Sequence, residues 1–300
     1  MSRKVLLQLV LPLIGLSVLF WLLAFAPGDK HHQPALLEMS VILRDGDGNV
    51  SAMRKGMEQA AKDLNVELRF LTPAEDNSAV EQVQLLEHEV SGAAPAILLI
   101  PADREALGEA VSAAAGKTTL VTVESDMTAW GADASISMDH QALGEALGKA
   151  ALNGVSFGGT VLLLDSLLGD NGVRERMEAA KALLEEKGRQ VRIYRWTSDS
   201  TAFANILRIE RPKAVIAFEA AALTEMAELS RGEEAFPLLY GCGSTAGIAA
   251  ALEKGRVTAI AAVNVFSAGY LAVEAAAKLA RHESWTGASS VGFSIVRQET

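Results

Sequence analysis

The fold of this chain is decided by residues 38–71, which read EMSVILRDGDGNVSAMRKGMEQAAKDLNVELRFL. An apolar run rich in branched residues ends in a Gly/Asp loop, as a buried strand does at its carboxyl end. Apolar residues then recur at helical spacing as far as Leu64, and a second short strand follows. These features predict a β-α-β unit. They place Asp47 and Asn49 where open parallel sheets bind their ligands.

Strands and helices alternate through the rest of the chain. The expected strands are 96–100, 119–123, 135–138, 160–165, 191–196, 214–218, 238–240, 257–263 and 293–296. The expected helices are 102–115, 141–153, 172–187, 222–229, 245–253 and 268–281. Alternation at this spacing predicts parallel sheets with helices on both faces. The chain has 300 residues, half of them hydrophobic, which suits two lobes of ordinary domain size.

Composition and motifs exclude several classes of function. The net charge of −10 and the lack of a basic stripe argue against a nucleic-acid partner. Asp45, Asp47 and Asn49 begin like a calcium loop, but Val50 stands where that loop requires glycine. The pair at 31–32 is the only adjacent histidine pair, and a solvated linker explains it better than a metal. We therefore expect no metal, no cofactor and no catalytic constellation.

The amino-terminal residues resemble a membrane segment. Arg3 and Lys4 precede the apolar residues 5–26, a length that reaches the roughly 20 residues needed to span a bilayer. Pro27 follows directly and should hinder cleavage of a signal peptide. We expect residues 1–27 to be a retained anchor, with a cleaved signal as the alternative, and residues 28–37 to be a tether. In either case the bulk of the chain is expected on the extracytoplasmic side.

Five short stretches together carry a resemblance to a known family. They are GMEQAA at 56–61, AILLIPAD at 96–103, SMD at 137–139, RER at 174–176 and GRVTA at 255–259. Their order and spacing resemble the type I periplasmic sugar-binding proteins, the ribose-binding family. The resemblance covers the chain from about Glu38 to its end, and each stretch alone is a weak signal.

The resemblance implies an α/β fold of two doubly wound, parallel-sheet lobes joined by three crossing segments. The crossings are expected near Asp139, Val263–Asn264 and Gly292. The N-terminal lobe would then be residues 38–138 plus 264–292, and the C-terminal lobe 139–263 plus 293–300. The regulators that share this fold are disfavoured, because the chain begins with an apolar membrane-like segment and not with a helix-turn-helix.

The resemblance also implies a set of ligand-binding residues. Arg176 matches the family's ligand-gripping arginine and lies one turn into a helix. A surface arginine paired with neighbouring glutamates is the alternative. The full set of expected ligand-binding residues is Asp47, Asn49, Glu124, Ser125, Arg176, Glu219 and Asn264.

The sequence departs from the family pattern at several of these positions. Ser125 replaces an arginine, Glu219 replaces an asparagine, and Val263, next to Asn264, replaces a glutamine. The expected cleft is therefore acidic, which suits sugar hydroxyls and equally an amine. For the glutamates the alternative is a solvated loop carboxylate. Trp130 and Trp196 would stack on a sugar or fill the edge of a core.

The resemblance leads to an expected function. We expect an extracytoplasmic solute-binding protein that captures a small polar ligand, sugar or sugar-like, between its lobes and delivers it to an ABC-type permease in the membrane. The alternative is a membrane-anchored sensor of the same fold that signals to a kinase or receptor. An enzyme is not expected, because no catalytic constellation is present.

Overall fold

The computed structural model describes residues 35–45, 51–166, 171–232, 236–287 and 289–298. The expected membrane segment at 1–27 and most of the expected tether lie outside these residues. Within the described ranges, no helix has both the length and the apolar character needed to cross a bilayer.

The first sheet contains five parallel strands. They are β1 (Leu37–Ile42), β2 (Val66–Leu71), β3 (Ala96–Leu99), β4 (Thr119–Glu124) and β5 (Ala134–Ser137), in the order β2-β1-β3-β4-β5. The central strands are apolar on both sides, and all four residues of β3 are buried. A continuous apolar strand of this kind is typical of a parallel sheet covered on both faces.

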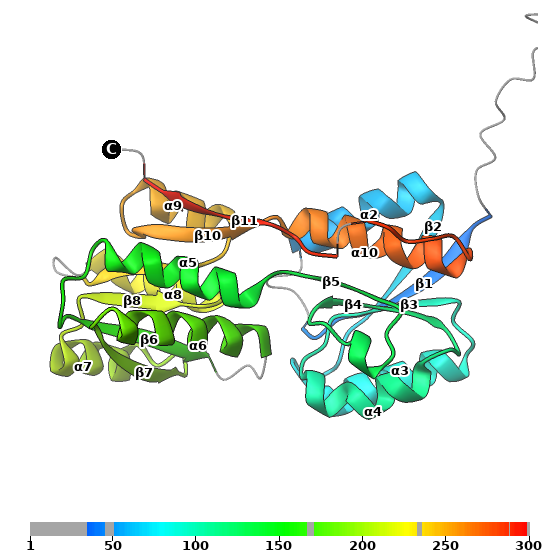
Figure 1. Cartoon of the computed structure of the whole chain (residues 1–300), viewed down its shortest axis with the longest axis horizontal. Coiled ribbons are helices and arrows are strands. Elements are labelled where there is room, and N and C mark those ends of the chain that lie inside the picture. Colours follow the sequence, from blue (N-terminus) through cyan, green and yellow to red (C-terminus); the bar gives the residue numbers. More distant parts are fainter. Residues whose placement is uncertain (1–34, 46–50, 167–170, 233–235, 288, 299–300) are drawn as a thin grey trace, which may run out of the picture. The chain divides into compact units, whose positions relative to one another are not determined.

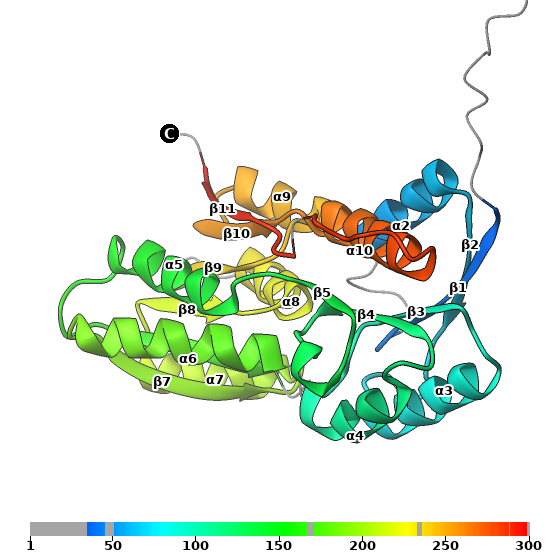
Figure 2. The same ribbon diagram turned by 45° about the vertical axis from the view of Figure 1, so that its right-hand side comes forward.

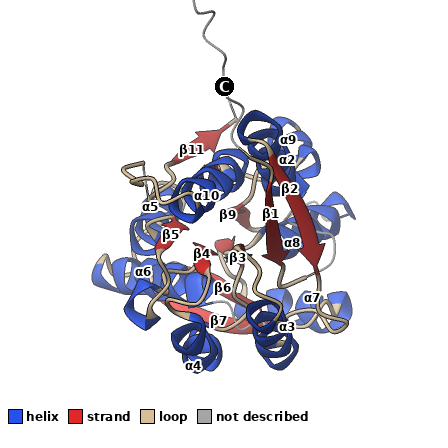
Figure 3. Cartoon of the chain, turned by 90° about the vertical axis from the view of Figure 1, so that its right-hand side faces the viewer, coloured by secondary structure: helices blue, strands red, loops and turns tan. Residues whose placement is uncertain are grey.

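Helices cover both faces of the first sheet (Figure 3). On one face are α2 (Ser51–Leu64) and α10 (Val265–Ala280), and on the other are α3 (Ala79–Ser91) and α4 (Arg104–Ala114). Figure 1 shows α2 and α10 side by side. Their close approach requires glycine, because a methyl group on Gly56 would collide with the carbonyl oxygen of Phe266.

The second sheet contains six strands. They are β6 (Thr160–Ser166), β7 (Gln190–Trp196), β8 (Ala214–Ala217), β9 (Leu238–Cys242), β10 (Ala259–Val263) and β11 (Phe293–Arg297), in the order β11-β10-β9-β8-β6-β7. All of the pairings are parallel except that of β11, which runs antiparallel to β10 at the edge.

Helices also cover both faces of the second sheet (Figure 2). On one face lie α5 (His140–Leu152) and α6 (Asn171–Glu186). On the other lie α7 (Ser200–Glu210), α8 (Ala220–Leu229) and α9 (Ala246–Glu253). Two short 3₁₀ turns, η1 (Thr128–Trp130) and η2 (Ser230–Gly232), complete the elements of the described ranges.

The chain passes between the two sheets three times. After β5 it continues into α5, which packs on the second sheet, and after β10 it returns as α10 to the first. Residues 289–291 then run beside Ser137, whose backbone bonds to Ser289 and Val291, before β11 joins the second sheet.

The α/β class and the parallel sheets in two lobes confirm the expectation from the sequence. The lobe limits given above stay a prediction. The sequence pattern does not predict α3 and α7. It also places the starts of α8 and α10 two and three residues too late.

Candidate ligand-binding site

An ion pair joins the carboxyl ends of two strands in the first lobe. Nη1 of Arg44, which follows β1, lies 2.9 Å from Oε2 of Glu124, the last residue of β4. The two side chains are only 12% and 14% exposed, and Arg44 also lies 3.5 Å from Asp45. Glu124 adopts a left-handed backbone, with φ of 70°, which is unusual for a glutamate. The carboxylate that the sequence predicts as a ligand contact is therefore already paired with Arg44, which it shares with Asp45.

The backbone carbonyl of Glu124 links the two lobes. It accepts a hydrogen bond from Oγ of Ser137 at 2.8 Å and contacts Nε2 of His140, the first residue of α5, at 2.9 Å. The neighbouring Ser125 is buried, at 6% exposure. The end of β4 is thus tied directly to a helix that packs on the second sheet.

Arg176 lies on α6 and is buried, at 7% exposure. Its Nε donates to Nδ1 of His140 at 3.0 Å, and its Nη1 donates to the carbonyl oxygen of Phe218 at 2.9 Å. Its Nη2 faces the sulfur of Met138 at 3.5 Å. Nε and Nη1 of Arg176 thus donate their hydrogen bonds to other groups of the protein. Arg176 therefore has a structural role, because it connects His140 on α5 to the backbone at the end of β8.

His140 connects these groups into one chain of hydrogen bonds. Since its Nδ1 accepts from Arg176, the ring proton sits on Nε2, which donates to the carbonyl of Glu124. The chain runs from the end of β4 through His140 and Arg176 to Phe218 at the end of β8. Neither Arg44 nor His140 is among the residues predicted from the sequence.

Cys242 lies near both the Arg176 guanidinium and the Glu219 carboxylate. Burial raises the pKa of the Cys242 thiol, and the nearby Arg176 charge offsets only part of this effect. Glu219 is half-buried and occupies the N-cap position of α8 without capping it through its side chain. The predicted residue Glu219 thus lies near Cys242, which also interacts with Arg176.

The remaining predicted residues are placed differently. Asn264 is exposed, and its side chain caps α10 by accepting from Ser267 at 3.0 Å. The side-chain oxygen of Asn264, a predicted ligand-binding residue, therefore takes part in the helix cap. Asp47 and Asn49 lie outside the described residues.

A pocket of about 380 Å³ lies beside this network. Ser125, Asp126, His140, Gly172 and Ser290 are among the residues that line it. At its edge Nη1 of Arg104, on α4, lies 3.3 Å from Glu175, on α6. The pocket is therefore bounded by both lobes.

Trp196 and Trp130, the two tryptophans considered as stacking residues, both contact other side chains of the protein. Trp196 is buried, meets Phe203 edge-on at 5.3 Å and donates its indole N–H to Glu225 at 2.9 Å. Trp130 lies under the guanidinium of Arg104, 5.9 Å from the ring centre. Of the two roles considered for Trp196, stacking on a sugar or filling the edge of a core, its burial in a hydrophobic cluster fits the second.

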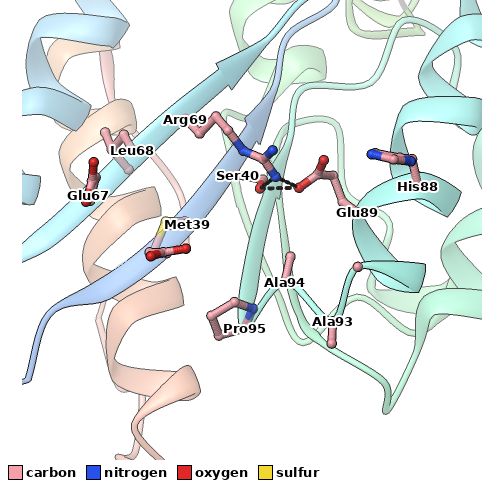
Figure 4. Close-up of a pocket in the computed structure, with 12 residues that line it drawn as sticks. Met39, Ser40, Glu67, Leu68, Arg69, His88, Glu89, Ala93, Ala94 and Pro95 are labelled. Carbon is pink, nitrogen blue, oxygen red and sulfur yellow. Dashed lines mark hydrogen bonds and ion pairs between the residues drawn. The ribbon is translucent and has the colours of Figure 1, made fainter.

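A larger pocket, of about 560 Å³, lies at the opposite edge of the first sheet, near the amino ends of β1 and β3 (Figure 4). Its polar floor is Glu89, which is 2% exposed. Oε2 of Glu89 accepts from Ser40 at 2.5 Å and from Arg69. Because these bonds join α3 to β1 and β2, we interpret the cluster as a structural ion pair.

No group of three or more His, Cys, Asp or Glu side chains within the described ranges has the arrangement to hold a metal ion.

The chain thus combines a two-lobed α/β fold with a polar network at the carboxyl ends of its strands, where parallel sheets bind their ligands. Residues 40–284 match the model of the periplasmic binding protein domain. This match covers most of the chain, which therefore belongs to the periplasmic binding protein family. The comparison with curated proteins finds no match.

Solved structures show the same fold at low sequence identity. An ABC transporter solute-binding protein from Agrobacterium vitis with bound D-fucose is 20% identical, with a TM-score of 0.79 over 87% of this chain and 95% of the other. A carbohydrate transporter solute-binding protein from Agrobacterium radiobacter in complex with D-arabinose is 17% identical, with a TM-score of 0.81 over 88% and 95%. A chain in the structure of a XylFII–LytSN complex is 17% identical, with a TM-score of 0.80 over 88% of this chain and 99% of the other.

Proposed function

We propose that this protein captures a small polar ligand, sugar or sugar-like, between its lobes and delivers it to an ABC-type permease. The observation that carries the proposal is the buried polar network in which Arg44 and Glu124 of one lobe meet His140 and Arg176 of the other. It lies at the carboxyl ends of parallel strands, where such sheets bind ligands. The sugars in the structures of similar proteins support the same class of ligand.

The pairing of Glu124 with Arg44 favours a neutral ligand over an amine at this carboxylate. Glu124 is already paired with Arg44 at 2.9 Å, so a cationic ligand would have to break that pair or leave a charge unbalanced. A sugar hydroxyl both donates and accepts, and it therefore fits between a carboxylate and a guanidinium without changing the net charge.

We propose that ligand contacts come from the residues predicted above together with Arg44 and His140. The lobes are proposed to close on the ligand by a hinge motion about the three crossings. Small-angle scattering with and without a confirmed ligand tests this motion. A radius of gyration that does not change at saturating ligand would contradict it.

Thermal shift measurements test ligand capture itself. The protein from residue 28 onward is heated with single sugars, polyols and amines. A ligand at a hundred times its Kd should stabilise the fold by about 2.7 kcal/mol, because it binds only the folded state. We expect a neutral sugar or polyol to raise Tm. If only amines do so, the charge argument is wrong, and if no compound does so, ligand capture by this cleft is not supported.

We propose that residues 5–26 hold the protein on the extracytoplasmic side of a membrane. Their apolar character, the preceding Arg3 and Lys4 and the following Pro27 support the proposal. Amino-terminal sequencing of the mature protein tests it. A mature chain that begins near Pro27 and is free in solution would rule out the anchor in favour of a cleaved signal.

A second candidate function is ligand sensing for a membrane kinase or receptor. The XylFII–LytSN structure favours it, because a protein of this fold is seen there in a complex with a second protein. Deleting the gene separates the two functions. Loss of uptake of the radiolabelled ligand indicates delivery to a permease, whereas intact uptake with a lost transcriptional response to the ligand indicates sensing.

A further inference from the structure

A second pocket lies in the C-terminal lobe, away from the network described above. It has a volume of about 580 Å³ and is formed by α7, by the segment that follows it and by residues 236–237. Lys213 directly precedes β8, and Pro237 directly precedes β9. The pocket therefore lies at the amino ends of these strands, whereas the network with Arg176 lies at their carboxyl ends.

The lining of this pocket has two chemically different parts. Its apolar part comes from Phe203, which is 1% exposed, and from the partly buried Leu207, Leu229 and Phe236. Its rim carries three exposed basic residues, which we call the basic rim. They are Arg208, Arg211 and Lys213.

No described carboxylate forms an ion pair with a residue of the basic rim. Nη2 of Arg208 donates to the neutral Asn205 at 3.1 Å. Two other exposed arginines of this lobe do have acidic neighbours: Arg192 lies 3.6 Å from Glu210, and Arg231 pairs with Glu228. The whole chain has a net charge of −10, whereas the basic rim groups three positive charges beside an apolar surface.

We infer that this pocket binds a small amphiphilic anion, a molecule with an apolar body and one carboxylate, sulfonate or phosphate group. Its volume is within the range of about 300–1,000 Å³ that is typical of small-molecule sites, and its lining combines apolar side chains with polar and charged ones. The apolar body would lie against Phe203 and Leu207, and the anionic group would face the basic rim. A role in the helix alone is the competing explanation, since Arg208 lies in the last turn of α7 and Arg211 caps it.

The probe for the test is 1-anilinonaphthalene-8-sulfonate, which has an aromatic body and one sulfonate. We expect the native, full chain to bind it saturably, with one site per chain. Binding should weaken between about 0.01 and 0.15 M salt, because the screening length falls from about 30 Å to about 8 Å. No saturable binding, or binding that salt does not change, overturns the inference.

Matched variants place the probe in the pocket. The test variant is Arg208→Gln/Arg211→Gln/Lys213→Gln, and the control, Lys187→Gln/Arg192→Gln/Arg231→Gln, removes three exposed charges from the same lobe.

We expect the test variant to bind about tenfold more weakly and the control to bind like the parent. Equal weakening in both variants overturns the inference. So does unchanged binding in the test variant, most clearly if its Tm falls, because the basic rim would then serve only the helix.

Competitors test the two parts of the proposed ligand. Decanoate should displace the probe, whereas decanol, which lacks the charge, and acetate, which lacks the apolar body, should displace it much less. Displacement by decanol as readily as by decanoate overturns the role of the basic rim.

Glu233 and Glu234 precede Phe236 in the sequence and lie outside the described residues. If Glu233→Gln/Glu234→Gln binds the probe and the parent chain does not, the inference fails for the native protein.

Discussion

Replacing Arg176 by alanine should destabilise the fold, because this side chain is 7% exposed and joins two elements. The change removes its hydrogen bonds to Phe218 and His140 and leaves two buried acceptors without a donor. Bonds to a charged group contribute about 1.5–3 kcal/mol each, so the two together give about 3–6 kcal/mol. Water entering the vacated space restores part of this. We expect the free energy of unfolding to fall by about 2–4 kcal/mol.

Urea denaturation measures this change. Arg176→Lys keeps the charge but has no planar fork to reach both acceptors, and it should lose about half as much stability. Arg174→Ala is the control, since it removes an exposed arginine two residues away on the same helix. We expect that control to stay within about 0.5 kcal/mol of the parent.

An unfolding free energy for Arg176→Ala equal to that of the control would refute the reasoning. Ligand affinity, measured by calorimetry below the melting temperature of the variant, is a separate result. A contact between Arg176 and the ligand would appear there as a loss of one to two decades in Kd, the equivalent of one charged hydrogen bond.

Three further changes test other parts of the fold. Gly56→Ala should cost about 1–3 kcal/mol in a denaturant melt, because its methyl group would force α2 away from α10; a parent-like melt would contradict this packing. Arg69→Ala should cost about 1–3 kcal/mol by leaving the buried Glu89 without its cation, and Glu89→Gln in the same background should recover part of the loss. Burial raises the pKa of the Cys242 thiol, so a thiol reagent should modify the native protein much more slowly than the urea-unfolded chain. The unfolded thiol loses its proton first, near its ordinary pKa of about 8.5, so stability should decline as the pH rises past that value, and Cys242→Ala should remove this part of the decline.

The sequence predicts the sheets well and two of the helices poorly, for a physical reason. Strands such as β3 and β8 are fully apolar, so even a short run of this kind is visible without other information. In α3, however, two of the three buried residues are Gln82 and Glu89, which interrupt the apolar period. Gln82 is buried because it bonds to backbone groups of Leu43, Ile100 and Ala102, contacts that no local pattern reveals.

Capping signals would have found both helices. Ser78 accepts from the backbone of Glu81 at the start of α3, and the two form the S-x-x-E pattern of a helix start. Asp199 accepts from Ala202 at the start of α7, a helix with a single buried residue, Phe203. In each case the cap is the stronger signal, and the apolar face is too weak to show the helix.

The site is predictable only as far as strand ends can be located. Glu124, Arg176 and Glu219 are recognisable because each has a family-like position: Glu124 ends a strand, Arg176 lies one turn into a helix, and Glu219 precedes one. Arg44 and His140 are not, because their roles depend on partners far along the chain, Glu124 for both and Arg176 for His140. Such pairings are tertiary, and local spacing does not encode them.

The position of α10 bears on how the protein is made. This helix covers one face of the first sheet beside α2, yet it is synthesised after every strand of the second sheet except β11. The first lobe therefore cannot close its core as it leaves the ribosome, and β1 to β5 must wait, with the apolar face under α10 uncovered, until about residue 280 has emerged. A chain that crosses a membrane unfolded would avoid this delay, because folding would then start with both lobes complete. Chaperones that hold nascent chains should accordingly bind this protein longest through its earliest strands.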